Sequence, residues 1–255
     1  MRISVITVAY NSEKTIGDTI TSVLSQTYGD IEYIVVDGNS KDGTMDIVRK
    51  YEPEFRGRMK YVSEPDGGIY DAMNKGIKMA SGDVVGTLNS DDIFAANDVI
   101  EKVSETFANT DCECMFGNLN LVDSGNPEKI LREWNTGGYR DGSFKRGWHP
   151  AHPTFYAYKK LFEKLGYYRT DFKIAADFEL MLRFIGIEKV KSSFLDKLMV
   201  VQRAGGASTK LSGHIRGNIE SMKAFKVNNQ RCPIFLIPGK VLPKMLNFIR
   251  HLTRY

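Results

Sequence analysis

The chain has 255 residues, of which 42% are hydrophobic and 26% charged, the balance of a globular protein with a sizeable core. No stretch reaches the roughly 18 consecutive apolar residues of a membrane span. Residues 1–8 lead into no small-residue cleavage site, which argues against a secretory signal and predicts a cytoplasmic protein. Cys112, Cys114 and Cys232 lack zinc-site spacing, and we interpret them as reduced, structural residues.

Charge is distributed unevenly along the chain. Residues 203–255 hold ten Lys or Arg residues and one acid, Glu220, for a net charge of +9, whereas residues 1–202 carry −5. A basic tail on a slightly acidic body predicts that the tail faces something anionic. Nucleic acid, an anionic lipid surface and a phosphorylated substrate all fit this pattern.

Strands and helices alternate over the first hundred residues. Residues 3–9 form an apolar run typical of a buried strand, and Asn11 and Ser12 then offer side-chain caps to a helix over residues 16–24. Further strands are predicted at 31–36, 59–62 and 84–88, and further helices at 44–51 and 69–80. This alternation is typical of an α/β fold, with a mainly parallel sheet covered on both faces.

Each of these strands leads into a polar loop. The loops are residues 7–11, 37–42, 64–70 and 89–92. Ligands of parallel sheets bind outside the carboxyl ends of the strands, so the four loops predict a site for a polar, phosphorylated ligand. Neither a P-loop nor Gly-x-Gly-x-x-Gly follows the first strand, which disfavours an ATPase or a dinucleotide dehydrogenase.

Two adjacent carboxylates, Asp91 and Asp92, follow the fourth predicted strand. They repel each other unless a cation or a donor-rich ligand offsets their charge. Mg²⁺ and Mn²⁺ bind one or two carboxylates together with substrate phosphates, and so can stabilise a departing diphosphate. The pair could also cap a helix before Ile93, but its position on the same sheet edge as Asp37 favours the metal.

Two other loops on this edge carry candidate binding residues. Asp37 could accept hydrogen bonds from a base or a ribose, or could simply form an Asp-Gly turn. Pro and Gly bend segment 64–68, after which Tyr70 and Asn74 share one face of a helix. A plain helix start is the alternative for this segment.

These motifs resemble family 2 glycosyltransferases. The matching segments are VITVAYN (5–11), VVDGNSKDGT (35–44), GIKMASGD (76–83) and NSDD (89–92), in the order and spacing of that family. The resemblance covers about residues 1–210, and segment 64–76 looks most like the branch of colanic-acid-type and other bacterial exopolysaccharide transferases. It implies a GT-A fold, a nucleoside-diphosphate-sugar donor with UDP-sugars favoured, Mn²⁺ or Mg²⁺ as cofactor, and inversion at the anomeric carbon.

The resemblance also implies roles for individual residues. Asp37 is similar to the carboxylate that holds the nucleoside base, and metal binding would rest mainly on Asp92, with Asp91 nearer the ribose. Asn89 stands where the family often has an acid. The expected donor-binding residues are Thr7, Ala9, Tyr10, Asn11, Asp37, Asp66, Tyr70, Asn74, Asn89, Asp91 and Arg203, and the expected metal ligands are Asp92 and Asp91.

The family's catalytic base corresponds to Asp177, with Ala176 where Glu is common. An aspartate there could take the proton of an acceptor hydroxyl within about 2.6–3.2 Å, or could cap a helix over 178–185, and the two roles are compatible. His152 resembles an acceptor-side residue that contacts the donor phosphate, the metal or the acceptor, although a local hydrogen-bonding role fits equally. Arg203 opens an Arg-Ala-Gly-Gly-Ala-Ser element that could neutralise the diphosphate, or form a turn.

The tail defines the expected domain division. Residues 1–210 would form the catalytic domain, with a nucleotide-sugar half to about residue 110 and an acceptor half from 111, followed by a basic amphipathic helical extension over 211–255. From residue 215 the pattern is helical, with prolines interrupting it from 233. The extension could lie on an anionic membrane, pack on the catalytic domain or form a dimer contact, and no nucleic-acid motif accompanies its charge.

The sequence therefore predicts a metal-dependent inverting transferase. It would move a hexose-type unit from a nucleoside diphosphate to a hydroxyl of a glycan or lipid-linked acceptor in bacterial surface polysaccharide synthesis, in the cytoplasm or at the inner face of the plasma membrane. Two alternatives stay open. A sugar-phosphate nucleotidyltransferase should have a first loop richer in Gly and Lys or Arg, and a non-catalytic module would bind a nucleotide sugar without turnover.

Overall fold

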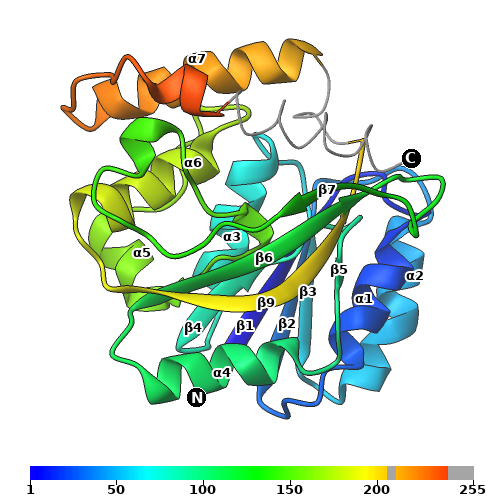
Figure 1. The fold of residues 1–255 in the computed structure, drawn as a ribbon. Coiled ribbons are helices and arrows are strands. Elements are labelled where there is room, and N and C mark those ends of the chain that lie inside the picture. The colour runs from blue at the N-terminus through cyan, green and yellow to red at the C-terminus, as the bar shows by residue number, and fades with distance from the viewer. Residues whose placement is uncertain (206–210, 241–255) are drawn as a thin grey trace.

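The computed structural model describes residues 1–205 and 211–240 (Figure 1). Its strands are β1 (Ile3–Ala9), β2 (Ile31–Asp37), β3 (Met59–Ser63), β4 (Val84–Thr87), β5 (Ile93–Phe94), β6 (Cys114–Val122), β7 (Ile130–Trp134), β8 (Tyr156–Tyr158) and β9 (Ser192–Arg203). Its helices are α1 (Ile16–Leu24), α2 (Thr44–Tyr51), α3 (Ile69–Met79), α4 (Val99–Asn109), α5 (Lys159–Leu165), α6 (Ala176–Met181) and α7 (Leu211–Val227). Short helical turns are η1 (Glu52–Phe55), η2 (Phe144–Arg146), η3 (His152–Thr154) and the π-helical η4 (Leu182–Ile187).

The predicted elements of the first hundred residues are confirmed, with ends that agree to within one residue. The predicted cap of the first helix is wrong. α1 begins only at Ile16, and the backbone carbonyl of Ser12, not a side chain, accepts the amides of Thr15 and Ile16 at 3.0 and 2.9 Å. Asn11 has a left-handed φ of 49° and its side chain accepts the Lys41 amide at 2.9 Å, so it joins the loops after β1 and β2 instead.

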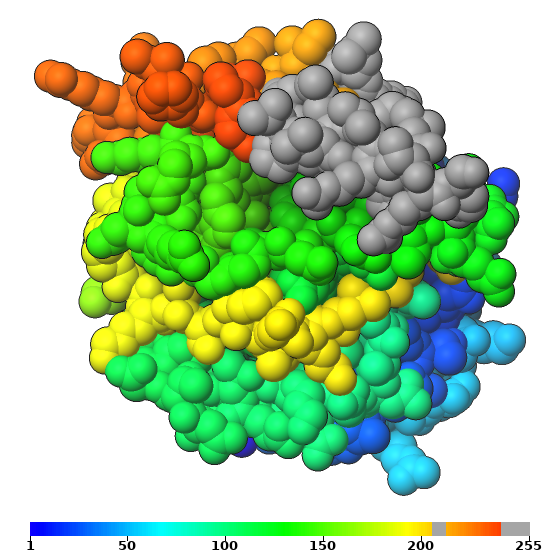
Figure 2. Space-filling view, in the orientation of Figure 1, coloured from blue at the N-terminus to red at the C-terminus, as the bar shows by residue number. Residues whose placement is uncertain are grey.

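All strands of the described chain belong to one sheet, in the order β3-β2-β1-β4-β8-β6-β9-β5, with β7 paired to β6. β1, β2, β3 and β4 are parallel to their neighbours in the first half. β8 joins this half to the second half through antiparallel pairs with β4 and β6, and β6 is parallel to β9. β9 runs across one face of the molecule directly below the segment that contains β6 and β7 (Figure 2). The predicted mainly parallel, helix-flanked sheet is confirmed.

Two apolar layers cover the sheet, because successive side chains of a strand point to opposite faces. Val5 and Val35 pack with the buried sides of α1, α2 and α4. Ile6 and Val36 pack with those of α3, α5 and α6. The loops at the carboxyl ends of β1, β2 and β4 therefore project from a rigid, fully buried base.

Residues 211–240 pack on the domain. Ala224, Phe225 and Leu236 are buried in the same core as α6, and the Phe225 ring lies 6.2 Å from that of Phe178. Residues 241–255 lie outside the described part. In residues 1–205 and 211–240, no helix has the length and apolar character needed to cross a membrane. Cys112 and Cys114 are buried and Cys232 is exposed; all three carry free thiols.

Candidate active site

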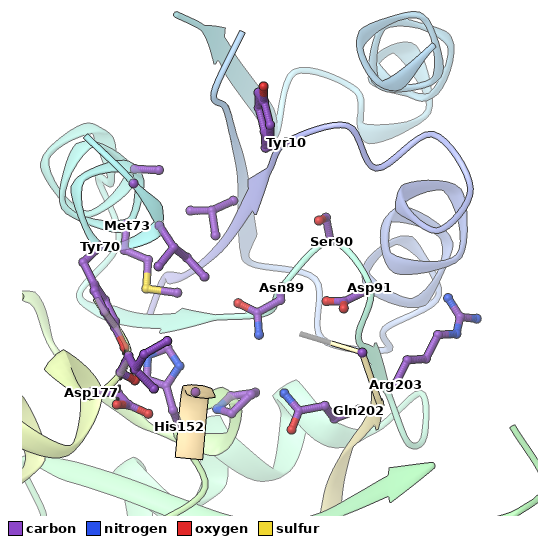
Figure 3. Close-up of a pocket in the computed structure, with 18 of the residues that line it drawn as sticks. Tyr10, Tyr70, Met73, Asn89, Ser90, Asp91, His152, Asp177, Gln202 and Arg203 are labelled. Carbon is purple, nitrogen blue, oxygen red and sulfur yellow. Dashed lines mark hydrogen bonds between the residues drawn. The ribbon is translucent and has the colours of Figure 1, made fainter. Parts of the chain in front are cut away.

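A cavity of about 1250 Å³ lies where the ends of β1, β2 and β4 face the second half of the chain. Drug-sized ligand pockets typically measure about 300–1,000 Å³, so this cavity has room for two substrates. Figure 3 shows the loop after β4 and the end of β9 on one side of it, and Tyr70 and Asp177 on the other. The predicted site residues that line it are Ala9, Tyr10, Asn11, Asp66, Tyr70, Asn89, Asp91, His152, Asp177 and Arg203.

Asp37 occupies a different position from the one its predicted role requires. Its carboxylate is completely buried and accepts hydrogen bonds from the Ser40 amide at 2.9 Å, from the Ser63 hydroxyl at 2.6 Å and from the Ser40 hydroxyl. The neighbouring Gly38 and Asp66 line the cavity. Asp37 thus shapes the loop after β2, and Asp66 presents the carboxylate on this side of the cavity.

Thr7 and Asn74 also hold the frame of the site. The Thr7 hydroxyl accepts a hydrogen bond from the Tyr33 hydroxyl at 3.0 Å inside the core. The Asn74 side-chain amide donates to the Tyr168 carbonyl at 2.8 Å and accepts the Tyr168 amide at 3.0 Å. Asn74 thereby joins α3 to the segment before α6, and both buried side chains indicate structural roles.

The two carboxylates after β4 differ in exposure. Asp91 is partly exposed and lines the cavity, whereas Asp92 is completely buried beneath it. Asn89 and Gln202 donate hydrogen bonds to the Asp92 Oδ2 at 2.9 and 3.3 Å. Burial, and secondly the charge of Asp91, hold the pKa of Asp92 well above its usual value. Burial also raises the pKa of Asp91, against the opposing charge of Arg203.

Two orphan oxygens test whether a divalent cation fits here. Asn89 Oδ1 and Asp92 Oδ1 are buried and have no hydrogen-bond partner within the described chain, beside the carboxylate of Asp91. In the same residues, no three His, Cys, Asp or Glu side chains gather into a metal-binding cluster. Mg²⁺ and Mn²⁺ use few protein oxygens and fill their shell with phosphate and water, so this oxygen set fits such a cation together with a diphosphate. Asp91 reaches the cavity directly, whereas Asp92, including its orphan oxygen, is buried beneath it and does not line it.

Asp177 lies on the opposite wall, in the first turn of α6. The helix begins one residue earlier, at Ala176, so the predicted N-cap role of Asp177 is wrong. The Phe178 amide donates to Asp177 Oδ1 at 2.8 Å, and the Tyr70 hydroxyl lies 3.5 Å from the same oxygen. Tyr70 is in turn anchored by donation to the Ile174 carbonyl at 2.7 Å. Asp177 Oδ1 is therefore held at the start of the helix, and these groups leave Oδ2 available to a substrate.

His152 lies near Asp177, in η3 (Figure 3). Its Nε2 is 2.9 Å from the Tyr168 hydroxyl and 3.4 Å from the Thr87 hydroxyl. Burial lowers the pKa of His152, although the charge of Asp177 opposes this shift, so the imidazole is neutral at pH 7. A neutral imidazole beside the Asp177 carboxylate can accept or donate a hydrogen bond without forming an ion pair with that carboxylate.

Arg203 ends β9 on the same side as Asp91. Its Nη2 contacts the Asp18 carboxylate on α1 at 2.6 Å, and its charge lowers the pKa of Asp91. The guanidinium is thus fixed at the cavity rim, where it can receive an anionic group. Most of the predicted Gly-Gly-x-Ser element lies outside the described residues.

Several cavity residues carried no sequence signal. Gln202 supports Asp92, Lys173 precedes α6, and Arg132 and Trp134 project from β7. None belongs to a recognisable motif. The two-residue spacing of Arg132 and Trp134 places both on one face of a strand, but only the pairing of β7 with β6 shows which face.

A parallel sheet with a carboxylate loop at its edge, facing an aspartate across a large cavity, is the arrangement expected of a glycosyltransferase that binds a nucleotide sugar. The model of the family "Glycosyl transferase family 2" matches residues 4–173, and the chain belongs to this family. The predicted family is thereby confirmed, and with it the prediction of a glycosyltransferase; the exopolysaccharide branch stays a prediction.

Curated relatives agree with this assignment. The chain is similar to an uncharacterized glycosyltransferase of Mycobacterium tuberculosis, with 36% identity over 189 residues that cover 71% of this chain and 68% of the relative. It is also similar to a PGL/p-HBAD biosynthesis glycosyltransferase of Mycobacterium bovis, with 30% identity over 169 residues that cover 64% of this chain and 62% of the relative.

Solved structures share the fold. Staphylococcus aureus TarS 1-349 in complex with UDP-GlcNAc superposes with a TM-score of 0.64 at 22% identity, covering 81% of this chain and 59% of that chain. The mannosyltransferase PcManGT from Pyrobaculum calidifontis, in complex with GDP-Man and Mn²⁺, superposes with a TM-score of 0.64 at 22% identity, covering 96% and 69%. The chain thus spans about three fifths of the TarS chain, and the predicted GT-A fold is confirmed.

Proposed function

We propose that this chain is a metal-dependent inverting glycosyltransferase. It transfers a sugar from a nucleoside-diphosphate sugar, with UDP-sugars favoured, to a hydroxyl of a glycan or lipid-linked acceptor in bacterial surface polysaccharide synthesis. The observation that carries the proposal is that Asp91 and Asp177 face one large cavity from opposite walls. The nucleotide sugars named with the structural neighbours, and the biosynthetic name of the mycobacterial relative, support it.

The donor occupies the strand-end wall in this proposal. Tyr10, Asn11 and Asp66 surround the nucleoside, and Asp91 and Arg203 lie at the diphosphate. Mn²⁺ or Mg²⁺, when bound by Asp91 with the orphan oxygen of Asp92, supplies positive charge to the departing diphosphate. Mn²⁺ is the ion named with the mannosyltransferase neighbour. Arg203 contributes a second, fixed cation that stabilises the same developing charge.

The acceptor hydroxyl approaches from the wall of Asp177. As its oxygen bonds to the anomeric carbon and the bond to the diphosphate breaks, Asp177 takes the hydroxyl proton. Base and leaving group stand on opposite sides of the cavity, which suits a single displacement with inversion. The amide of Phe178 holds the Asp177 carboxylate in place, and neutral His152 supplies a hydrogen bond to a sugar hydroxyl.

Asp177→Asn tests this assignment. Removing a general base should lower kcat by about 10²–10⁴-fold, whereas the Kd of UDP should stay within twofold because the donor wall is intact. The donor is first identified by thermal shift against a panel of nucleoside-diphosphate sugars, with and without Mn²⁺. Asp46→Asn, an exposed carboxylate on α2, is the matched control. Unchanged turnover in Asp177→Asn would exclude this residue as the base.

The proposal extends to an anionic membrane as the place of action, at its cytoplasmic face. α7 and the following segment expose an apolar set, and Lys226 and Arg231 add positive charge. Exposed apolar residues beside cations bind anionic bilayers. The apolar set is Ile215, Ile219, Met222, Ile234 and Phe235.

Ile234→Glu/Phe235→Glu tests the membrane contact, because both side chains are largely exposed and their replacement leaves the core intact. The variant should lose sedimentation with phosphatidylglycerol vesicles, and high salt should weaken binding of the unmodified protein. Tyr61→Glu, an exposed apolar residue on β3, is the control. Undiminished sedimentation of the double variant would rule out this surface.

A further inference from the structure

β7 presents two side chains to the cavity from the margin of the sheet. Arg132 pairs with Leu121 on β6, and Leu121 pairs with Gln202 on β9. Paired residues of neighbouring strands point to the same face, and all three line the cavity. Trp134, two residues along β7, shares this face. The strand pairing therefore directs the Arg132 side chain towards the cavity, independently of its length and flexibility.

Within the described residues, no acidic group compensates the charge of Arg132. Its Nε is buried without a hydrogen-bond partner, and no carboxylate of residues 1–205 or 211–240 forms an ion pair with it. Burial alone lowers the pKa of Arg132 to about 10. Arg132 as a whole is half-buried, but a charged group with one N–H withdrawn from water and without a partner is costly, so this position is explained best if an anion joins it.

The indole ring of Trp134 contacts the guanidinium of Arg132. The Arg132 Cζ lies 4.2 Å from the centre of the indole, whose ring meets His149 edge-on at 5.1 Å and 86°. Stacking engages the face of a guanidinium and leaves the N–H groups at its edge free to donate. Two such donors match the spacing of two oxygens on a phosphate or carboxylate.

The position of Arg132 separates it from the donor diphosphate. Two strand spacings, about 10 Å, lie between Arg132 and Gln202, which contacts the Asp92 carboxylate. Arg203 already provides a cation on the Asp91 side. The gap leaves room for the transferred sugar between the two cations, which places Arg132 on the acceptor side.

We propose that Arg132, oriented by Trp134, binds an oxyanion of the acceptor, and that the enzyme therefore prefers acceptors that carry a phosphate or carboxylate close to the reacting sugar. This inference rests on the proposed function for the place of the donor. Two kinds of acceptor carry such an oxyanion: a sugar phosphate and a uronic acid.

Direct binding tests the proposal without requiring turnover. Glucose 1-phosphate, glucuronate and methyl glucoside are titrated by calorimetry into the full chain saturated with UDP and Mn²⁺. Charge-assisted hydrogen bonds to a buried Arg should make at least one charged sugar bind about 10- to 100-fold tighter than methyl glucoside. The tighter of the two charged sugars identifies the source of the oxyanion.

Variants assign this preference to a residue. Arg132→Gln should abolish it and leave the Kd of UDP within twofold, and Arg132→Lys should retain part of it because the charge remains while the stacked fork is lost. Arg140→Gln, an exposed neighbour outside the cavity, should behave as the unmodified protein.

Three results would overturn the proposal. Equal binding of charged and neutral sugars by the unmodified protein would show that the acceptor oxyanion is not recognised. Loss of UDP binding in Arg132→Gln would assign Arg132 to the donor diphosphate. Persistence of the preference in Arg132→Gln would place the anion elsewhere. If the unmodified protein binds no nucleoside diphosphate of the panel, the proposed function fails, and the charged-sugar preference measured without a nucleotide then decides the Arg132 site separately.

Discussion

The two walls of the cavity are built in different ways. On the wall that we propose binds the donor (the donor wall), Tyr10 and Asp91 follow closely on β1 and β4, whose buried neighbours are parallel strands of the same half. On the wall that we propose binds the acceptor (the acceptor wall), Arg132 comes from β7 at the margin of the sheet, His152 from a short 3-10 turn and Asp177 from a helix start. The donor wall depends on local strand-to-loop succession, whereas the acceptor wall depends on contacts between distant segments.

Two carboxylates, one on α7 and one on α6 itself, stabilise the acceptor wall. Glu220 of α7 accepts the backbone amides of Lys173, Ile174 and Ala175 at 2.8–3.0 Å, just before α6. Glu179 is almost completely buried and pairs with Arg183. The position of Asp177 therefore depends on Glu220, which lies far away in the chain, and on the Glu179–Arg183 pair that begins in its own helix. We expect substitutions on this wall to have different consequences from substitutions on the donor wall.

The largest expected effect is that of a substitution on the donor wall, which should weaken nucleotide binding as well as turnover. Asp91→Asn removes the carboxylate that reaches the proposed cation and should lower turnover by about 10²–10⁴-fold, the several kcal/mol that a catalytic metal supplies. Unlike Asp177→Asn, it should also weaken Mn²⁺-dependent UDP binding, measured by calorimetry with and without Mn²⁺. Asp111→Asn, an exposed carboxylate away from the cavity, serves as the control. Unchanged metal dependence would remove Asp91 from the metal site.

The next effect concerns the rigidity of the acceptor wall. Glu179→Ala leaves Arg183 charged and largely buried, with Arg183 held only by the carbonyls of Leu165, Gly166 and Tyr167. Breaking a buried pair in this way should lower the free energy of unfolding by about 3–5 kcal/mol, measured by urea titration. Glu105→Ala removes an exposed pair on α4 and should cost less than about 1 kcal/mol. Similar losses in both variants would contradict the idea that α6 is clamped by this pair.

The smallest expected effect is on the pH dependence of stability, through Glu32 in the donor half. Burial by itself would raise the pKa of Glu32, but hydrogen bonds from Lys60, Ser4 and Ser81 lower it from 4.5 to about 2. A depressed carboxyl pKa stabilises the fold above pH 4.5, and this stability is lost as the pH falls from 4.5 towards 2. The contribution is at most about 3 kcal/mol.

Unfolding of the unmodified protein by urea at several pH values measures the Glu32 effect, and Glu32→Gln should flatten that part of the pH profile. Asp46→Asn, which changes an exposed carboxylate, should leave the profile unchanged. An identical acid dependence in Glu32→Gln and the unmodified protein would show that another carboxylate carries it.

The donor wall was largely predictable because strand period and turn chemistry act over a few residues. Ala9, Tyr10, Asn89 and Asp91 follow apolar runs that can only be buried strands, and the structure places all four at the cavity. Asp37 and Asp92 also follow such runs, yet both are completely buried. Whether a carboxylate at a strand end faces the ligand or the loop depends on partners such as Ser63 and Gln202, which lie far away in the chain.

The order of strands and helices over the first hundred residues, the sheet edge predicted to carry the site and the family followed from the sequence alone, because apolar periodicity and short polar motifs are local properties. Only the tertiary structure decided that Arg132 and Trp134 face the cavity, that Asp91 is exposed while Asp92 is buried, and that α7 supports the loop before Asp177. Each of these depends on strand pairing or helix packing between segments far apart in the chain. Such long-range contacts leave no pattern in a single sequence. A polar residue at the end of a strand can face the ligand or the neighbouring loop, and only the packing of distant segments decides which.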